Sequence, residues 1–93
     1  MEIETFDDAF DALADTPAGA ANMKARADLM TGIRTRVKSW KIPQEQGASR
    51  LGLTRPRLND LMRGKLDKFS LDALVNIATA AGFILHIELD EVG

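Results

Sequence analysis

Polar side chains crowd the start of one short predicted helix, at about residues 55–63. They are Arg55, Arg57, Asn59 and Asp60, which helical spacing leaves facing outward or to the sides. Leu58, Leu61 and Met62 turn inward. A purely structural module does not explain why bases and an amide gather at a helix start, so we expect these side chains to recognise a partner.

The chain offers no alternative set of catalytic groups. It has no cysteine, a single histidine (His86) and no glycine-rich loop of the kind that cradles phosphate. An isolated histidine is far more often a surface or contact residue than a ligand or a catalyst. The sequence therefore predicts neither an enzyme nor a metal site nor a cofactor.

A helix, a turn and a second helix are predicted to position the polar side chains. The first helix is expected at residues 44–51, where Gly47 and Ala48 are small enough to let the next helix cross closely. Residues 51–54 form the turn, because Gly52 permits positive φ after a helix end and Thr54 can cap the next helix. This pattern is typical of a helix-turn-helix, whose second helix is presented to DNA.

The remaining chain divides into three predicted parts. Residues 1–15 form an acidic segment with a short amphipathic helix, and residues 16–82 form the helix-turn-helix domain. That domain begins with a helix at about 17–39, started by Thr16-Pro17, and ends with a helix at about 71–81, capped by Ser70. The apolar stripe of the first helix consists of Met23, Ala27, Met30, Ile33, Val37 and Trp40. Residues 83–93 hold a terminal strand and tail.

The strand is predicted from alternation at residues 83–89. Phe83, Leu85, Ile87 and Leu89 share one face, and Ile84, His86 and Glu88 share the other. A lone strand cannot satisfy its backbone groups, so we expect it to pair either with its copy in a second subunit or with residues 1–5. The predicted dimerisation residues are Phe83, Ile84, Leu85, His86, Ile87 and Leu89. A two-fold homodimer is what a palindromic operator requires.

Charge is distributed unevenly along the 93 residues. Residues 1–20 hold six acids and no base, residues 21–69 hold all twelve Lys and Arg against four acids (net +8), and the rest holds four acids. A basic centre between acidic ends favours double-stranded DNA as a partner. The N-terminus lacks a signal-peptide pattern, and no 18-residue apolar run could span a membrane. These observations predict a single-domain, cytoplasmic protein with no membrane partner.

The sequence resembles a known family. Residues 21–30, 50–65, 69–74 and 80–82 are similar to the XRE (Cro/cI-type) helix-turn-helix proteins, and in particular to the compact subgroup of HigA-type antitoxins. The resemblance implies a mostly α, lambda-repressor-like domain of five helices, or of four plus an N-terminal helix, with one C-terminal β-strand paired across a dimer. Pro43 stands where the family commonly has a capping threonine, and Gly47 where alanine is usual.

The resemblance also implies roles for individual residues. Base edges would be contacted by Arg55, Arg57, Asn59 and Asp60. Phosphates would be contacted by Gln44, Thr54, Arg63, Lys65 and Lys68. The chemistry agrees, because arginine can bond guanine O6 and N7 together and asparagine can do likewise to adenine.

Two functions are compatible with this sequence. The first is a repressor that is also the antitoxin of a HigBA/RelE-type pair, autoregulates its operon and neutralises a small basic toxin. Phe6, Phe10 and Leu13 on the acidic N-terminal segment are then the candidate toxin contacts. The alternative is a phage or host XRE-type regulator without a toxin partner.

Overall fold

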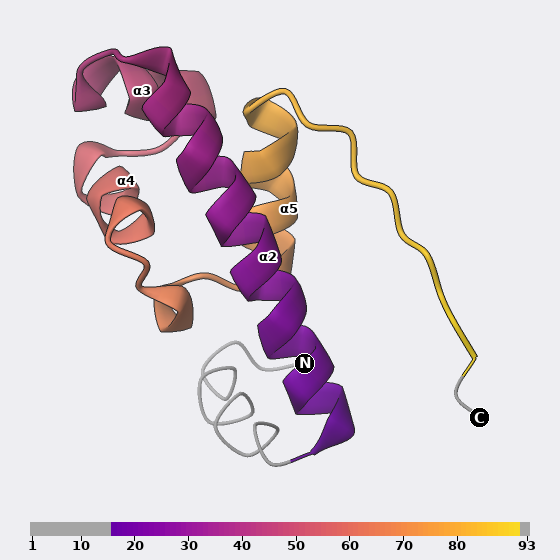
Figure 1. Ribbon diagram of the computed structural model, residues 1–93. Helices are drawn as coiled ribbons and strands as arrows, with labels where there is room; N and C mark the ends of the chain where they lie inside the picture. The colour runs from indigo at the N-terminus through magenta and orange to yellow at the C-terminus, as the bar shows by residue number, and fades with distance from the viewer. Residues whose placement is uncertain (1–15, 92–93) are drawn as a thin grey trace.

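The computed structural model describes residues 16–91, and this part of the chain is mostly helical (Figure 1). In chain order its elements are α2 (Pro17–Trp40), α3 (Gln44–Leu51), α4 (Arg55–Met62), the 3₁₀ turn η2 (Leu66–Lys68) and α5 (Leu71–Ala80). The predicted fold class is confirmed for the helices of this region, and their ends lie within one or two residues of the expected positions. The helix predicted within residues 1–15 lies outside the described residues.

The long helix α2 packs against α4 and α5; in the view of Figure 1, α3 and α4 lie to its left and α5 lies to its right, partly behind it. Helix α2 starts as expected, because the Thr16 hydroxyl accepts a hydrogen bond from the Gly19 amide (3.0 Å) and Pro17 occupies the first turn. The helices enclose one apolar core. Its fully buried large side chains are Ile33, Leu58, Leu61, Phe69 and Leu74.

The predicted apolar stripe of α2 is wrong at its first residue, since Met23 is 41% exposed. The buried side chain in this part of the helix is Arg26. Its Nε donates to Asn22 Oδ1 (2.7 Å), and its Nη1 donates to the carbonyls of Leu66 (3.1 Å) and Phe69 (3.5 Å). A buried guanidinium is tolerated because carbonyl and amide oxygens surround it. Arg26 thereby fastens η2 and the residue after it to α2.

Burial also changes the electrostatics of Arg26. Desolvation lowers the pKa of its guanidinium, and the nearby Asp67 carboxylate acts in the opposite direction. An arginine side chain nevertheless stays protonated in a protein. Arg26, one of the twelve basic residues, is therefore a permanent positive charge inside the fold and does not reach a partner at the surface.

The strand predicted at 83–89 is not formed. Gly82, at φ 96°, turns the chain away from α5, and the Phe83 amide donates to the Ala78 carbonyl (3.0 Å). Beyond it the chain runs extended along one side of the molecule (Figure 1), and residues 16–91 contain no β-strand. The physical reason is that this stretch of chain provides no second extended segment to pair with it. Pairing with residues 1–5 lies outside the described residues, and pairing with a second subunit stays a prediction.

Candidate nucleic-acid interface

The turn between α3 and α4 sets the angle at which α4 is presented. Gly52 has φ 70°, its amide donates to the Ser49 carbonyl (3.2 Å), and the Leu53 amide donates to the Ala48 carbonyl (2.8 Å). These two bonds form a Schellman motif, which ends a helix in a fixed direction. Thr54 then caps α4, because its hydroxyl accepts a hydrogen bond from the Arg57 amide (3.3 Å).

Close packing of the two helices buries one face of α4. A Cβ placed on Gly47 of α3 would lie 3.4 Å from Leu58 Cδ2 and 3.8 Å from Val37 Cγ1, so α4 passes near the α3 backbone at this point. Leu58 and Leu61 are fully buried on this side. The other side of α4 is left to its polar residues.

Two of the predicted base-contacting residues have free polar groups. Arg55 is exposed and Asn59 is half-buried, and neither side chain makes a hydrogen bond or ion pair within the described chain. Asp60 is half-buried, and its Oδ1 lies 3.5 Å from Lys65 Nζ. The first turns of α4 therefore present an uncommitted guanidinium and an uncommitted amide.

Arg57, the fourth predicted base contact, is committed within the protein. Its Nη1 donates to the Lys68 carbonyl (2.7 Å), and its guanidinium carbon lies 4.0 Å from the centre of the Phe69 ring. The distance to the ring is within the range of a cation–π interaction. The prediction that Arg57 contacts a base is untested, but these contacts favour another role.

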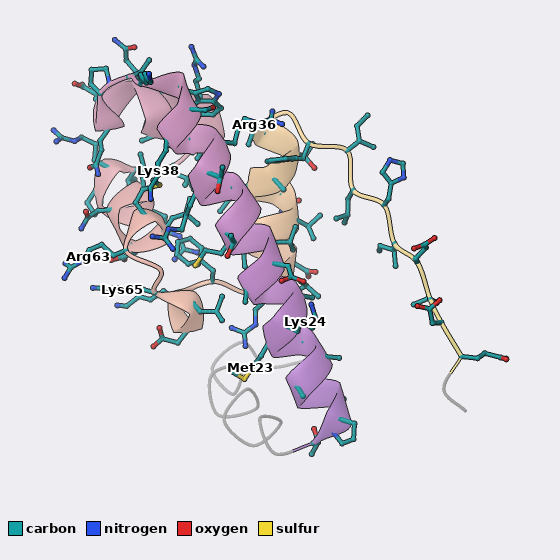
Figure 2. The ribbon with its side chains drawn as sticks, viewed as in Figure 1. Met23, Lys24, Arg36, Lys38, Arg63 and Lys65 are labelled. Atoms are coloured by element: carbon teal, nitrogen blue, oxygen red, sulfur yellow. The ribbon has the colours of Figure 1, made fainter. Side chains whose placement is uncertain are left out.

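Residues predicted to contact phosphate lie at both ends of the helix-turn-helix. Arg63 and Lys65 come directly after α4 and project from the same edge of the molecule (Figure 2). Arg63 is exposed, as is Lys68 at the end of η2, whereas Lys65 is half-buried. The Thr54 hydroxyl is engaged as the α4 cap. Exposed ammonium and guanidinium groups at this edge are suited to phosphate oxygens.

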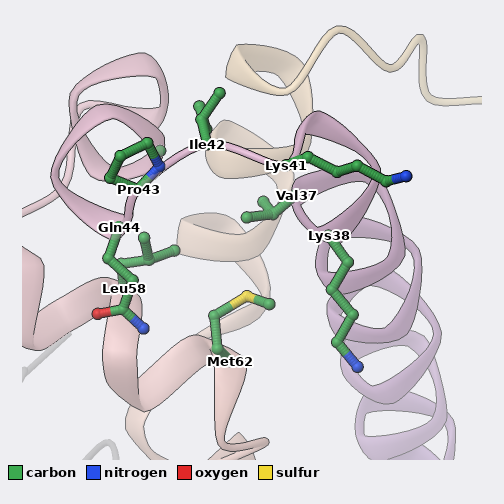
Figure 3. A pocket seen from close by; sticks show the side chains of 9 residues that line it. Val37, Lys38, Lys41, Ile42, Pro43, Gln44, Leu58 and Met62 are labelled. Atoms are coloured by element: carbon green, nitrogen blue, oxygen red, sulfur yellow. The ribbon is translucent and has the colours of Figure 1, made fainter.

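Gln44 lies at the start of α3, beside a hollow of about 210 Å³ between the end of α2 and the start of α3. Figure 3 shows Gln44 and Lys38 on opposite sides of this hollow, with the side chains of Val37, Leu58 and Met62 between them. From the sequence, Lys38 is one of several bases on the first long helix that either lie along a phosphate backbone or keep the helix soluble. The structure places it in the last turn of α2, directly before the helix-turn-helix.

The remaining predicted contacts are the dimerisation residues and the possible toxin contacts. The six dimerisation residues lie in the extended segment after α5, where Phe83 is half-buried and the next five are exposed. The Arg36 guanidinium carbon lies 4.1 Å from the centre of the Phe83 ring, and its Nη1 donates to the Ala81 carbonyl (3.1 Å). Phe6, Phe10 and Leu13 lie outside the described residues.

This arrangement of a capped, outward-facing helix on a short helix and a glycine turn defines a helix-turn-helix domain. Residues 12–90 match the family model described as Helix-turn-helix domain, and the chain belongs to that family. No curated protein matches the chain. The family places the protein in the class of DNA-binding domains used in transcription regulation. Within the described residues, no helix has the length and apolar character needed to cross a membrane.

Proposed function

We propose that the protein is a dimeric, sequence-specific repressor that binds a palindromic operator in its own promoter. The observation that carries the proposal is that two polar groups on α4, the Arg55 guanidinium and the Asn59 amide, have no partner in the described chain. They lie in the first two turns of a helix whose opposite side is buried. A helix of this kind fits the major groove, where these two side chains can each make paired hydrogen bonds to a base.

The roles of the surrounding residues are assigned from their positions. Arg55, Asn59 and Asp60 contact base edges, while Gln44, Thr54, Arg63, Lys65 and Lys68 contact phosphates on either side of the groove. Specific complexes generally combine the two kinds of contact, because phosphate contacts fix the register and base contacts carry the sequence information.

A second copy of the chain supplies the second half-site. We infer that the extended segment at 83–89 pairs with its copy about a two-fold axis, which satisfies its backbone and covers its exposed apolar side chains. Two recognition helices related in this way contact half-sites about one helical turn apart, ~34 Å. Footprinting on the promoter of the protein's own gene checks this spacing, and protection of a single half-site by the saturated protein would contradict it.

Point variants separate base contact from phosphate contact. The measurement is affinity at several salt concentrations, for a duplex selected by the wild-type protein from a randomised library and for a random duplex. Lys65→Ala should weaken both duplexes alike and reduce the salt slope by about one unit. Arg55→Ala should weaken the selected duplex more than the random one, at a cost of about 1–3 kcal/mol of discrimination. Equal losses of the two duplexes in both variants would contradict the assigned roles.

We further propose that the protein is an antitoxin of the HigA type, which autoregulates its operon and neutralises a RelE/HigB-type endonuclease. The supporting feature is the acidic segment 1–15, with six acids, no base, and Phe6, Phe10 and Leu13 at helical spacing. Such a segment offers a basic toxin both charge complementarity and apolar anchors. The alternative, a regulator without a toxin, is favoured if no small basic reading frame adjoins the gene.

Removal of residues 1–15 tests the toxin contact. The measurement is the affinity of the full chain and of the truncated chain for the product of the adjacent reading frame, with operator binding as the control for folding. A large loss of toxin affinity at unchanged operator affinity is expected. Unchanged toxin affinity would exclude this segment as the contact.

A further inference from the structure

The segment after α4 is held from two sides by arginines. From α2, Arg26 donates to the carbonyls of Leu66 and Phe69. From α4, Arg57 donates to the Lys68 carbonyl at 2.7 Å and stacks on the Phe69 ring at 4.0 Å. Together the two guanidinium groups donate hydrogen bonds to three of the four backbone carbonyls of residues 66–69.

Arg57 differs in this respect from its neighbour Arg55. The Arg55 side chain is exposed and makes no hydrogen bond or ion pair within residues 16–91, whereas Arg57 is half-buried and has a short charge-assisted hydrogen bond. Phe69, on which Arg57 stacks, is 1% exposed and belongs to the core. The ring therefore gives the guanidinium a fixed platform, which a surface aromatic side chain would not do.

The segment that Arg57 holds carries two of the predicted phosphate contacts. Lys65 precedes η2 and Lys68 ends it, and both stand beside the recognition helix rather than on it. Their positions relative to the groove depend on how firmly residues 65–69 are fixed to α4. Arg57 is the α4 side chain that makes this connection through both a carbonyl and a ring.

We propose that Arg57 is a positioning residue, which fixes residues 65–69 against α4 so that Lys65 and Lys68 meet phosphates, and that base reading on α4 is left to Arg55 and Asn59. The inference rests on the proposed DNA-binding function and replaces the base contact predicted for Arg57. For Arg57 to reach a base, its bond to Lys68 and its stacking on Phe69 would both have to be broken. No comparable cost attaches to Arg55.

The first test is made on the free full-length protein. Amide hydrogen exchange is measured by NMR for the wild type, Arg57→Ala, Arg57→Lys and the matched control Arg55→Ala. We expect exchange of the Lys68 and Phe69 amides to rise at least tenfold in both Arg57 variants, because lysine keeps the charge but not the planar stacking group. Arg55→Ala should leave the exchange of these two amides unchanged. Unchanged exchange in Arg57→Ala would overturn the proposal.

The second test uses DNA, with each variant selecting duplexes from the same randomised library. Arg57→Ala should select the wild-type consensus, bind the selected and random duplexes more weakly by similar factors, of about tenfold, and lose about one to two units of salt slope. Arg55→Ala should lose preference at one base pair. Loss of preference at a base pair in Arg57→Ala would overturn the positioning role alone. Failure of the wild type to select any consensus would instead overturn the proposed function.

Discussion

Two regions of the molecule contain the same local interaction, an arginine that donates to a backbone carbonyl and stacks on a phenylalanine ring. At the end of η2, Arg57 of α4 donates to the Lys68 carbonyl and stacks on Phe69; at the end of α5, Arg36 of α2 donates to the Ala81 carbonyl and stacks on Phe83. The two ring distances are nearly equal, 4.0 and 4.1 Å. We call these pairs, each with its carbonyl, the Arg57 clamp and the Arg36 clamp.

The difference between the two clamps lies in the chain beyond each aromatic ring. Phe69 is buried, and the next residue, Ser70, caps α5 by accepting a hydrogen bond from the Ala73 amide (3.1 Å). Phe83 is half-buried, and the chain after it exposes Ile84, Ile87 and Leu89 by 75–90%. A clamp can fix where a segment starts, but the backbone beyond it still needs a partner. The Arg57 clamp therefore leads into the next helix of the core, whereas the Arg36 clamp leads into an exposed segment, which we propose pairs with a second subunit.

The largest expected effect is on the stability of the domain. Phe69→Ala should lower the free energy of unfolding by about 3–5 kcal/mol, because it opens a cavity in the core. Phe83→Ala should cost only about 1–1.5 kcal/mol, since its ring is partly exposed already. Chemical denaturation at low protein concentration measures both. Similar losses in the two variants would mean that the two clamps do not differ as described.

The next effect is on assembly. A chain that ends at Gly82 should stay folded, with its free energy of unfolding lowered by about the 1–1.5 kcal/mol expected for loss of the Phe83 ring. It should sediment as a monomer, because the segment inferred to pair is gone. Its operator affinity should fall by roughly 10²–10⁴, the usual gain from linking two binding units. Analytical ultracentrifugation and operator titration provide the measurements. A truncated chain that still sediments as a dimer would contradict the pairing.

A smaller effect is expected from loss of the Arg36 clamp. Arg36→Ala removes one hydrogen bond to Ala81 and one ring contact with Phe83, together about 1–2 kcal/mol. Proteolysis after residue 82 should become faster while the helical domain stays resistant. Arg50→Ala is the matched control, because Arg50 stacks on Trp40 at 4.8 Å without bonding a carbonyl in the described chain. An equal increase in cleavage in the control would contradict the role given to Arg36.

The smallest effects concern two glycines. Gly47→Ala should raise the free energy of unfolding by about 0.5–1 kcal/mol, because the added methyl group meets Leu58 at an ordinary contact distance and alanine favours the helix. Gly82→Ala should lower it by about 1–2 kcal/mol, since φ is 96° and the new Cβ would lie 3.2 Å from Arg36 Nη1. Thermal unfolding of both variants measures the difference, and the same sign of change in both would contradict this account.

The helices could be predicted from the sequence because their signals are local. Thr16, Thr54 and Ser70 each cap a helix through an amide three residues ahead, and Gly52, Gly64 and Gly82 each take the positive φ that ends a helical stretch. None of these depends on distant parts of the chain. The polar start of α4 was predictable for the same reason, from spacing within a single helix.

The roles of the arginines were not predictable, because their partners are distant in the sequence. Arg26 bonds carbonyls 40 and 43 residues away, and Arg36 bonds one 45 residues away. A basic residue on a helix looks the same in the sequence whether it faces solvent or a buried carbonyl. The strand expected at 83–89 failed for a related reason. The alternation of its side chains is local and visible in the sequence, but a strand also requires a pairing partner, which residues 16–91 do not supply.

The acids in the exposed terminal segment have a consequence for aggregation. An extended segment that exposes Ile84, Ile87 and Leu89 could template open-ended stacking of many chains. In a parallel, in-register stack each Glu88 and Asp90 would lie over its own copies and repel them. An antiparallel pair centred on His86 instead sets Glu88 opposite Ile84. In the pairing that we propose, these acids would therefore allow two chains to associate and oppose the growth of fibres.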